Sequence, residues 1–396
     1  MNRADFSAPN TPTNPGQRYE VRFYPSNPLQ PGNVGSPLPQ TIPAWNIGEP
    51  LVALLYRRDS AGGEQLWVLT ERSLRRYRSD FTFDEQGVPQ VGTPAEREQY
   101  NQPLQTTTGA NTTPVACQGG YIRTGVANFL VVCPPQRAAD QASVLPTAWR
   151  IPYTAANEPL PAPIDLSAFV GNLPLRLALA QDRRGQPDQL LYLTPRQIGI
   201  AFLDTGPNLT EALNLPANLT NQNTAPSDLT LSPSNTALGL LAPPNTGGTL
   251  LLTWTLQAAN NPNPVSLENT LATRLNGTRF AGATAATAGS SPVHVLGQSF
   301  ARLENNALQL PPENLNLSLG YTAGLAATDQ FLYLTSSQNA TLTVVDLQIP
   351  TPNLTNTSFQ QNFLSLQSIP ATAAIPSPPP LLPALAFIPT AGAAAP

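Results

Sequence analysis

The chain contains no lysine, and all 20 of its basic residues are arginine. It also has only one methionine, Met1, one histidine, His294, and two cysteines among 396 residues. The absence of lysine excludes P-loop and Schiff-base chemistry, which depend on that side chain. One histidine and two cysteines are too few for a structural zinc site of the usual kind. We therefore expect no cofactor, with a structural divalent cation as the open alternative.

Charge is scarce as well, at 11% of residues, against about 25% in an average soluble protein. Residues 1–200 hold 17 Arg and 16 acidic residues, whereas residues 201–396 hold 3 Arg and 8 acidic residues. With an isoelectric point near 5.1, there is no global positive charge to attract nucleic acid, and we expect no such partner. No stretch reaches the roughly 18 apolar residues of a membrane helix, so no transmembrane segment is expected.

The two cysteines, Cys117 and Cys133, are expected to form a disulfide. The sequence between them predicts a hairpin that turns at Thr124-Gly125, which sets residue 117 opposite residue 133. Directly opposed residues have Cβ atoms close enough for a disulfide. Two free thiols in the core are the alternative, because disulfides are rare inside the cytosol. The disulfide predicts an extracytoplasmic location, either secreted or on the cell surface.

Residues 1–44 are rich in proline and asparagine and are expected to form an N-terminal tether, apart from one strand near residues 17–24. We expect Met1 to stand in for a processed N-terminus, where the native chain carries a lipid anchor as one option. The alternative is a cytoplasmic chain that begins naturally at Met1.

Internal repeats are the most informative feature of the sequence. Leu51–Arg78 and Leu175–Phe202 align without a gap at an offset of 124 residues, and both read as strand, polar turn, strand, tight turn, strand. A third copy begins at Asp329 and continues through Asp346. The first two copies are identical at seven positions: Leu51/Leu175, Leu55/Leu179, Gln65/Gln189, Leu66/Leu190, Leu69/Leu193, Thr70/Thr194 and Arg72/Arg196.

These repeats predict an all-β fold, a β-propeller over residues 45–390 with irregular extensions at both ends, the last an Ala/Pro tail at 391–396. A small sheet that is apolar on both faces, as at residues 66–69, must be covered by neighbouring copies. A propeller stacks such sheets radially and leaves only short edges. Seven blades are expected, with six as the main rival, and the strand near 17–24 is expected to close the ring with the last blade. The central strands fall near residues 67, 130, 191, 251, 295, 332 and 386.

The third copy resembles the repeats of YVTN-type seven-bladed β-propellers. Residues 326–335 and 342–346 show that family's turn Asp, its apolar-Tyr-apolar strand and a following strand that ends in Asp. Residues 227–236 resemble its turn between blades. Similar propellers serve as surface proteins, as lactonases and as cofactor enzymes, so the resemblance implies a fold and leaves the function open.

A cluster of arginines in the first repeat is the candidate ligand site. Arg72, Arg75, Arg76 and Arg78 could bind a phosphate, a sulfate or an acidic glycan as an anion patch. Strand alternation predicts Arg76 and Arg78 on one face and Arg75 on the other. The alternative is that these side chains and their neighbours Arg57 and Arg58 form ion pairs with nearby acids: Asp59, Glu64, Glu71 and Asp80.

The remaining candidates favour structural roles. His294 has Ser290 and Ser291 nearby but no G-x-S-x-G motif, so no catalytic residue is expected. Trp67 and Trp254 are expected in the core, with sugar stacking as the alternative. Turn carboxylates usually bond their own backbone, although in a propeller they can also converge on the channel around a cation. Those carboxylates are Asp182, Asp188, Asp204, Asp329 and Asp346.

Together these features predict a non-enzymatic, extracytoplasmic binding or assembly module of the cell envelope or surface, with a protein or a glycan as its partner. Two alternatives stay open. One is a propeller hydrolase or lactonase that uses channel carboxylates and a divalent cation. The other is a structural subunit of a filament or virus particle.

Overall fold

The computed structural model describes the side chains of most residues in the ranges 43–58, 63–83, 89–108, 111–135, 144–180, 188–201 and 210–242, apart from short gaps. It also describes Val21, Phe23, Leu252 and Trp254. Elsewhere it describes the backbones of the strands given below.

The architecture is all-β, made of small antiparallel sheets of consecutive strands. The first sheet joins β4 (Leu51–Arg58), β5 (Glu64–Thr70), β6 (Ser73–Arg78) and β9 (Glu98–Pro103). The next joins β12 (Tyr121–Thr124), β13 (Asn128–Cys133) and β14 (Thr147–Pro152). The third joins β15 (Arg176–Ala180), β16 (Gln189–Leu193), β17 (Gln197–Ala201) and β18 (Thr210–Asn214).

Three further four-stranded sheets follow in chain order. One joins β19 (Ala225–Leu231), β20 (Thr236–Ala242), β21 (Leu250–Thr255) and β22 (Asn263–Val265). Another joins β23 (Arg279–Ala281), β24 (Val293–Leu296), β25 (Phe300–Glu304) and β26 (Ala307–Gln309). The last joins β27 (Thr322–Ala327), β28 (Phe331–Ser336), β29 (Leu342–Asp346) and β30 (Phe363–Leu366).

The N-terminal strands share a sheet with the last strand of the chain. Here β1 (Asn2–Phe6) pairs with both β31 (Leu385–Ala386) and β2 (Tyr19–Phe23), and β2 pairs with β3 (Ala44–Asn46). This sheet joins the two ends of the chain, as the strand expected near residues 17–24 requires. The division of the chain at residues 44 and 390 stays a prediction.

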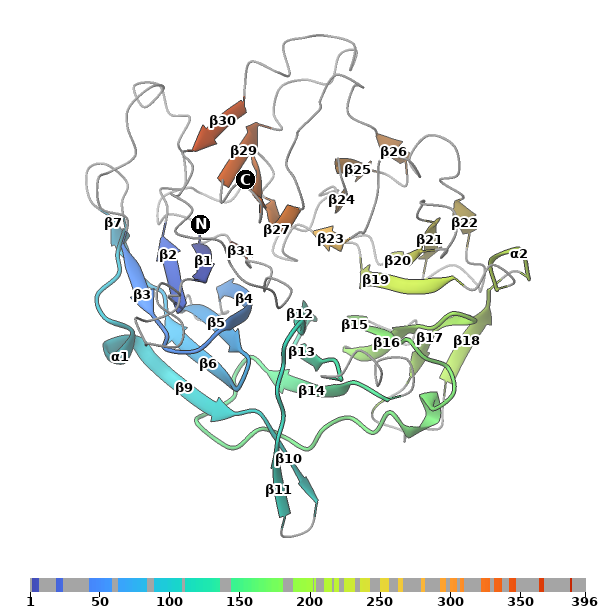
Figure 1. The fold of residues 1–396 in the computed structure, drawn as a ribbon, viewed down its shortest axis with the longest axis horizontal. Helices are drawn as coiled ribbons and strands as arrows, with labels where there is room; N and C mark the ends of the chain where they lie inside the picture. Colours follow the sequence, from blue (N-terminus) through green and yellow to red (C-terminus); the bar gives the residue numbers. More distant parts are fainter. Residues whose placement is uncertain are drawn as a thin grey trace, which may run out of the picture.

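The sheets lie around a common centre (Figure 1). The first strand of each sheet contacts the first strand of the next, from β4 through β12, β15, β19 and β23 to β27. The strand β31 contacts both β27 and β4. This radial arrangement of small antiparallel sheets is that of a propeller, because each sheet covers the apolar face of its neighbour.

The core lies between successive sheets. Trp67 and Phe129 pack with ring centroids 4.7 Å apart, between the β4 and β12 sheets. Trp45 packs against Phe23, 4.8 Å away, between the β3 and β4 sheets. The expectation that Trp67 and Trp254 are core residues is confirmed, and Trp45 and Trp149 are buried too. Each such aromatic removes a large apolar area from water, which holds the stack of sheets together.

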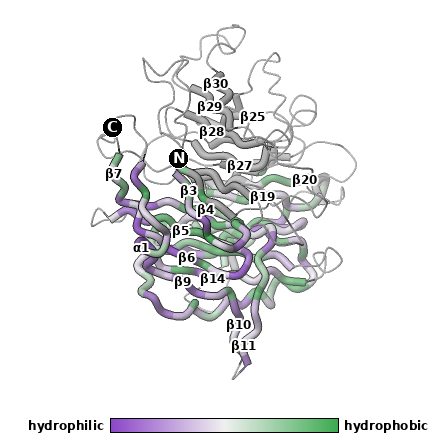
Figure 2. Tube along the Cα trace, turned by 60° about the vertical axis from the view of Figure 1, so that its left-hand side comes forward, coloured by the Kyte–Doolittle hydropathy of each residue, from purple (hydrophilic) through white to green (hydrophobic). Residues whose placement is uncertain are grey.

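Outside the stacked sheets lie two small additions. The strands β7 (Thr82–Phe83) and β8 (Pro89–Gln90) form a short pair. The strands β10 (Gln105–Thr108) and β11 (Asn111–Pro114) form a polar hairpin that projects from the body (Figure 2). The helical pieces are α1 (Pro94–Arg97), η1 (Ser167–Phe169) and α2 (Ala217–Thr220). None of the helices in the described part of the chain could span a membrane.

Candidate functional site

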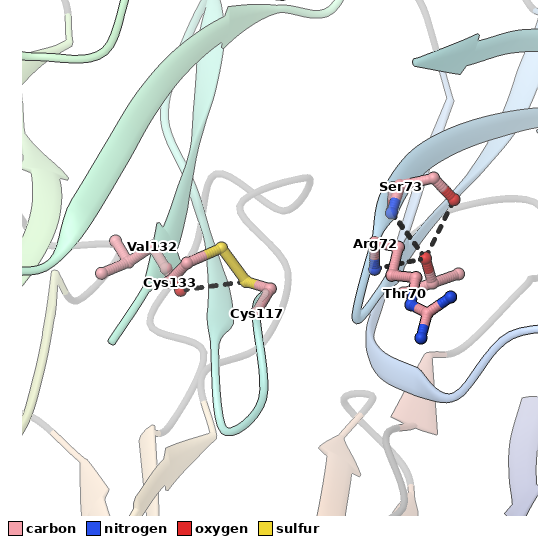
Figure 3. The surroundings of a disulfide bond; sticks show 6 residues. All are labelled: Thr70, Arg72, Ser73, Cys117, Val132 and Cys133. Carbon is pink, nitrogen blue, oxygen red and sulfur yellow. Dashed lines mark hydrogen bonds between the residues drawn. A yellow bond between two sulfur atoms is a disulfide. The ribbon is translucent and has the colours of Figure 1, made fainter. Parts of the chain in front are cut away.

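A tight turn between β5 and β6 presents Arg72 to solvent. The Oγ1 atom of Thr70 accepts hydrogen bonds from the backbone N–H groups of Arg72 at 3.2 Å and Ser73 at 2.8 Å. The carbonyl oxygen of Arg72 accepts the N–H of Leu104 at 2.7 Å. Such a side-chain bond to the following backbone fixes the turn locally. Thr70 is buried whereas Arg72 is exposed, and Figure 3 shows the turn with its bonds.

The same turn recurs between β16 and β17. Thr194 Oγ1 accepts the N–H groups of Arg196 at 3.2 Å and Gln197 at 2.9 Å. The carbonyl oxygen of Arg196 accepts the N–H of Leu215 at 2.7 Å, as that of Arg72 does in the first copy. Thr194 is buried and Arg196 exposed. The two repeats thus present an arginine in the same backbone setting.

The predicted disulfide between Cys117 and Cys133 is present, with both residues buried and their Cα atoms 4.6 Å apart. The backbone N–H of Cys117 donates to the carbonyl oxygen of Glu71 at 2.9 Å. Cys117 is thus linked to β13 through the disulfide and to the Thr70 turn through this hydrogen bond, and Figure 3 shows the disulfide and the turn in one view. Closing this short loop stabilises the fold by about 3 kcal/mol.

The hairpin register proposed for these cysteines is wrong. Thr124 pairs with Phe129, so the connection runs through residues 125–128, and the partner of Cys133 is Thr147 on β14. Cys117 precedes β12 and returns through a turn in which Gly119 has a φ of +73°, a conformation that glycine adopts without strain. The pair forms because this turn brings Cys117 back, not because the two residues face each other on opposed strands.

The longer 125–128 connection is held from another sheet by Asp188. Its carboxylate accepts the N–H groups of Val126, Ala127 and Asn128 at 2.5–2.8 Å, and the side-chain amide of Asn128 at 2.8 Å. Asp188 is 1% exposed and has a φ of +62°, which Asp tolerates better than most residues. A side chain at Gly125 would collide with this carboxylate and with the carbonyl oxygen of Asn128. The sequence marked Asp188 as a turn residue, but its partners lie about 60 residues away.

Arg57 and Arg76 also connect sheets at this end of the molecule. Arg57 donates through both terminal nitrogens to the carbonyl oxygen of Val126 at 3.2 Å, and its guanidinium lies 3.4 Å from the ring centroid of Tyr153. Arg76 donates to the carbonyl oxygen of Ala155 at 2.8 Å and lies over the ring of Trp67. Such cation–π and backbone contacts fix the two guanidiniums in place.

Arg75 points to the other side of its sheet, as alternation predicts. It contacts Glu49 at 2.5 Å and donates to the carbonyl oxygen of Ile47 at 3.1 Å. Burial raises the pKa of Glu49, but hydrogen bonds from Thr70 and Ser73 and the charge of Arg75 outweigh it and leave that pKa lowered. Arg78 pairs with Asp80 at 3.0 Å. The four predicted guanidiniums therefore do not converge, and two of them have carboxylate partners.

A further ionic contact lies among the innermost strands. Arg123 of β12 pairs with Asp228 of β19 and donates to the carbonyl oxygen of Leu229 at 3.0 Å. Arg176 of β15 donates to the carbonyl oxygen of Ser227 at 2.9 Å. β19 is an edge strand of its sheet, so the carbonyl oxygens on its outer side have no partner strand. The two arginine side chains donate hydrogen bonds to these oxygens instead. No local sequence pattern indicates this contact, because the residues lie 51 to 106 positions apart.

Several candidates fall outside the described residues. They are the side chains of His294 and Asp346, and Asp182, Asp204 and Asp329 entirely. Among the side chains that the structure does describe, no group of three or more His, Cys, Asp or Glu is placed to hold a metal ion.

No family model matches the chain, and no curated protein matches it. Some solved structures do. A virginiamycin B lyase from Staphylococcus aureus matches at 10% identity and a TM-score of 0.42, over 85% of this chain and 94% of that one. A streptogramin B lyase matches at 9% identity and 0.40, over 76% and 81%. The Pan2 WD40 domain of Neurospora crassa matches at 10% identity and 0.40, over 76% of each chain. Similarity this low says nothing about activity.

Proposed function

We propose that this protein is a non-enzymatic, extracytoplasmic binding or assembly module whose partner is a protein or glycan of the cell envelope or surface. One observation carries the proposal: buried charged groups such as Asp188 and Asp228 are used to hold separate sheets together. A carboxylate engaged in this way is not available as a general acid, a nucleophile or a metal ligand. The sheets present turns and a projecting polar hairpin to solvent, and exposed connections of this kind carry a disproportionate share of binding residues in proteins.

The extracytoplasmic location is supported by the disulfide, since such bonds persist in oxidising compartments. For the architecture we propose a closed ring of seven blades of the YVTN type. The cyclic order of contacts among the first strands supports this number, with β31 between β27 and β4. The short N-terminal strands β1 and β2 then complete the last blade and lock the ring.

Three experiments test the proposal. Native cells are lysed directly into denaturant that contains a thiol-alkylating reagent and no reductant, and the mass of the protein should show Cys117 and Cys133 unlabelled. Labelling of both would argue for a reducing compartment. A panel of lactones and esters, run with metal analysis, should show no turnover and no stoichiometric cation. Metal-dependent turnover would favour the lactonase alternative, and ordered polymers under the electron microscope would favour the filament alternative.

A further inference from the structure

Arg72 and Arg196 stand out among the positions that the two repeats share. Of the seven identical pairs, four are leucines that are buried in both copies. The threonines Thr70 and Thr194 are buried and bond their own turns. The glutamines also have fixed partners, because Gln65 accepts from the Trp67 indole and Gln189 from the N–H of Leu203. Packing or hydrogen bonding explains six of the seven identities.

The arginine pair has no such explanation in the fold. Both side chains are exposed, and neither guanidinium makes a hydrogen bond or an ion pair with any side chain that the structure describes. The charge of Arg72 does act on Glu71, whose pKa is nevertheless raised because burial outweighs it. Glu71 is therefore an acidic neighbour of Arg72 at this turn.

The two arginines lie on the same face of the ring. Arg57 at the end of β4 and Asp188 at the start of β16 both bind the 125–128 connection, so these ends of the sheets meet on one face, which we call the Asp188 face. From there β5 and β16 run in the same sense to their other ends. The turns with Arg72 and Arg196 follow those ends, and so they lie together on the opposite face, the Arg72 face.

We propose that Arg72 and Arg196 are two matched contact points for an acidic polysaccharide on the Arg72 face. A guanidinium is suited to bind carboxylate or sulfate through two parallel hydrogen bonds. Two equivalent cations held in the same backbone setting, two sheets apart, suit a polymer whose negative charges recur at intervals. A dense polyphosphate suits a protein of net charge −4 less well. The inference depends on the proposed binding function and gives it a ligand class.

The test measures binding of polygalacturonate and of chondroitin sulfate to the full chain in about 20 mM salt. The variants are Arg72→Gln, Arg196→Gln and the double variant. Arg78→Gln is the control, because Arg78 is also exposed but pairs with Asp80 and lies near the Asp188 face. We expect each single variant to weaken binding about threefold and the double variant about tenfold, with a shallower dependence on salt. Arg78→Gln should match the parent chain, and all variants should keep its melting temperature.

Three results would overturn the inference. One is that neither polymer binds the parent chain. Another is that the double variant binds as well as the parent or no worse than Arg78→Gln. The third is that single-stranded DNA binds more tightly than both polysaccharides and responds to the same substitutions. If neither polymer binds but a neutral glycan or a protein does, and that binding survives in the double variant, the ligand class fails while the binding module stays intact. The two proposals can therefore fail separately.

Discussion

Asp188 accepts two hydrogen bonds from Asn128, one from its backbone N–H and one from its side-chain amide, each 2.8 Å long. The two residues are 60 positions apart and belong to neighbouring sheets. With the N–H groups of Val126 and Ala127, the contact makes one buried carboxylate the cap of another sheet's turn. Charge-assisted bonds of this kind are the strong ones, and here four of them converge on one buried carboxylate.

We therefore expect Asp188→Asn to lower the free energy of unfolding by about 2–4 kcal/mol. Asparagine keeps the shape and tolerates the positive φ, so the loss would report the missing carboxylate alone. Urea unfolding measures it. Asp165→Asn is the control, because Asp165 is exposed and caps only the nearby Ser167, and it should cost clearly less. Equal losses in both variants would contradict the role of Asp188.

Reduction of the disulfide should lower the free energy of unfolding by about 3 kcal/mol, because it restores the conformational entropy that the closed loop removes from the unfolded chain. The measurement is thermal unfolding with and without a reducing agent. A variant with both Cys117 and Cys133 changed to serine should unfold at the temperature of the reduced protein. Its unfolding temperature should not change when the reducing agent is added. A parent chain whose unfolding temperature is also unchanged by the reducing agent would contradict the prediction.

Glu49 and Glu71 should affect acid stability with opposite signs. The pKa of Glu49 is lowered by its bonds to Thr70 and Arg75 despite burial, so its ionised form stabilises the fold above the ordinary value of 4.5. That contribution is lost as the pH falls from 4.5 through the lowered pKa. Glu49→Gln should thus be destabilising at pH 7 and nearly neutral at pH 3.

Burial raises the pKa of Glu71 despite the charge of Arg72, so its ionised form opposes folding at neutral pH. This penalty disappears as the pH falls through the raised pKa toward 4.5, where the folded chain takes up a proton first. Glu71→Gln should accordingly raise the free energy of unfolding above that of the parent chain at pH 7, and this gain should be smaller at pH 3. Denaturant unfolding across this range decides both predictions, and parallel pH profiles for the two variants would refute them.

The absence of lysine makes an alkaline test unusually clean. Burial raises the pKa of Tyr77 to about 12 and that of Tyr100 to about 12, from an ordinary 10. Between pH 10 and pH 12 the unfolded chain loses these protons first, so stability should fall by about 1–2 kcal/mol per tyrosine. Tyr77→Phe should flatten that decline. Absorbance of the phenolate gives the titration directly, and a Tyr77 that ionises near pH 10 would contradict the prediction.

The repeat pattern predicted much of the fold. Alignment of Leu51–Arg78 with Leu175–Phe202 predicted the strands and tight turns of both sheets, and the shared Thr70 and Thr194 form the same turn bonds. The 125–128 connection was misplaced because no local residue decides its length. Asp188 does, from another sheet. The anion patch groups arginines that are close in sequence. Arg75 and Arg76 point to opposite sides of β6, so they do not form one patch.

The amino-acid sequence by itself determined the kind of unit this protein is built from. Period-two alternation, apolar residues on both faces and turn residues at fixed offsets are local properties, and they favour small stacked sheets. Only the tertiary structure decided which charged groups form contacts between those sheets and which face solvent. That choice depends on pairs such as Arg123 and Asp228, 105 residues apart, and no local pattern records contacts between sheets so far apart in the sequence.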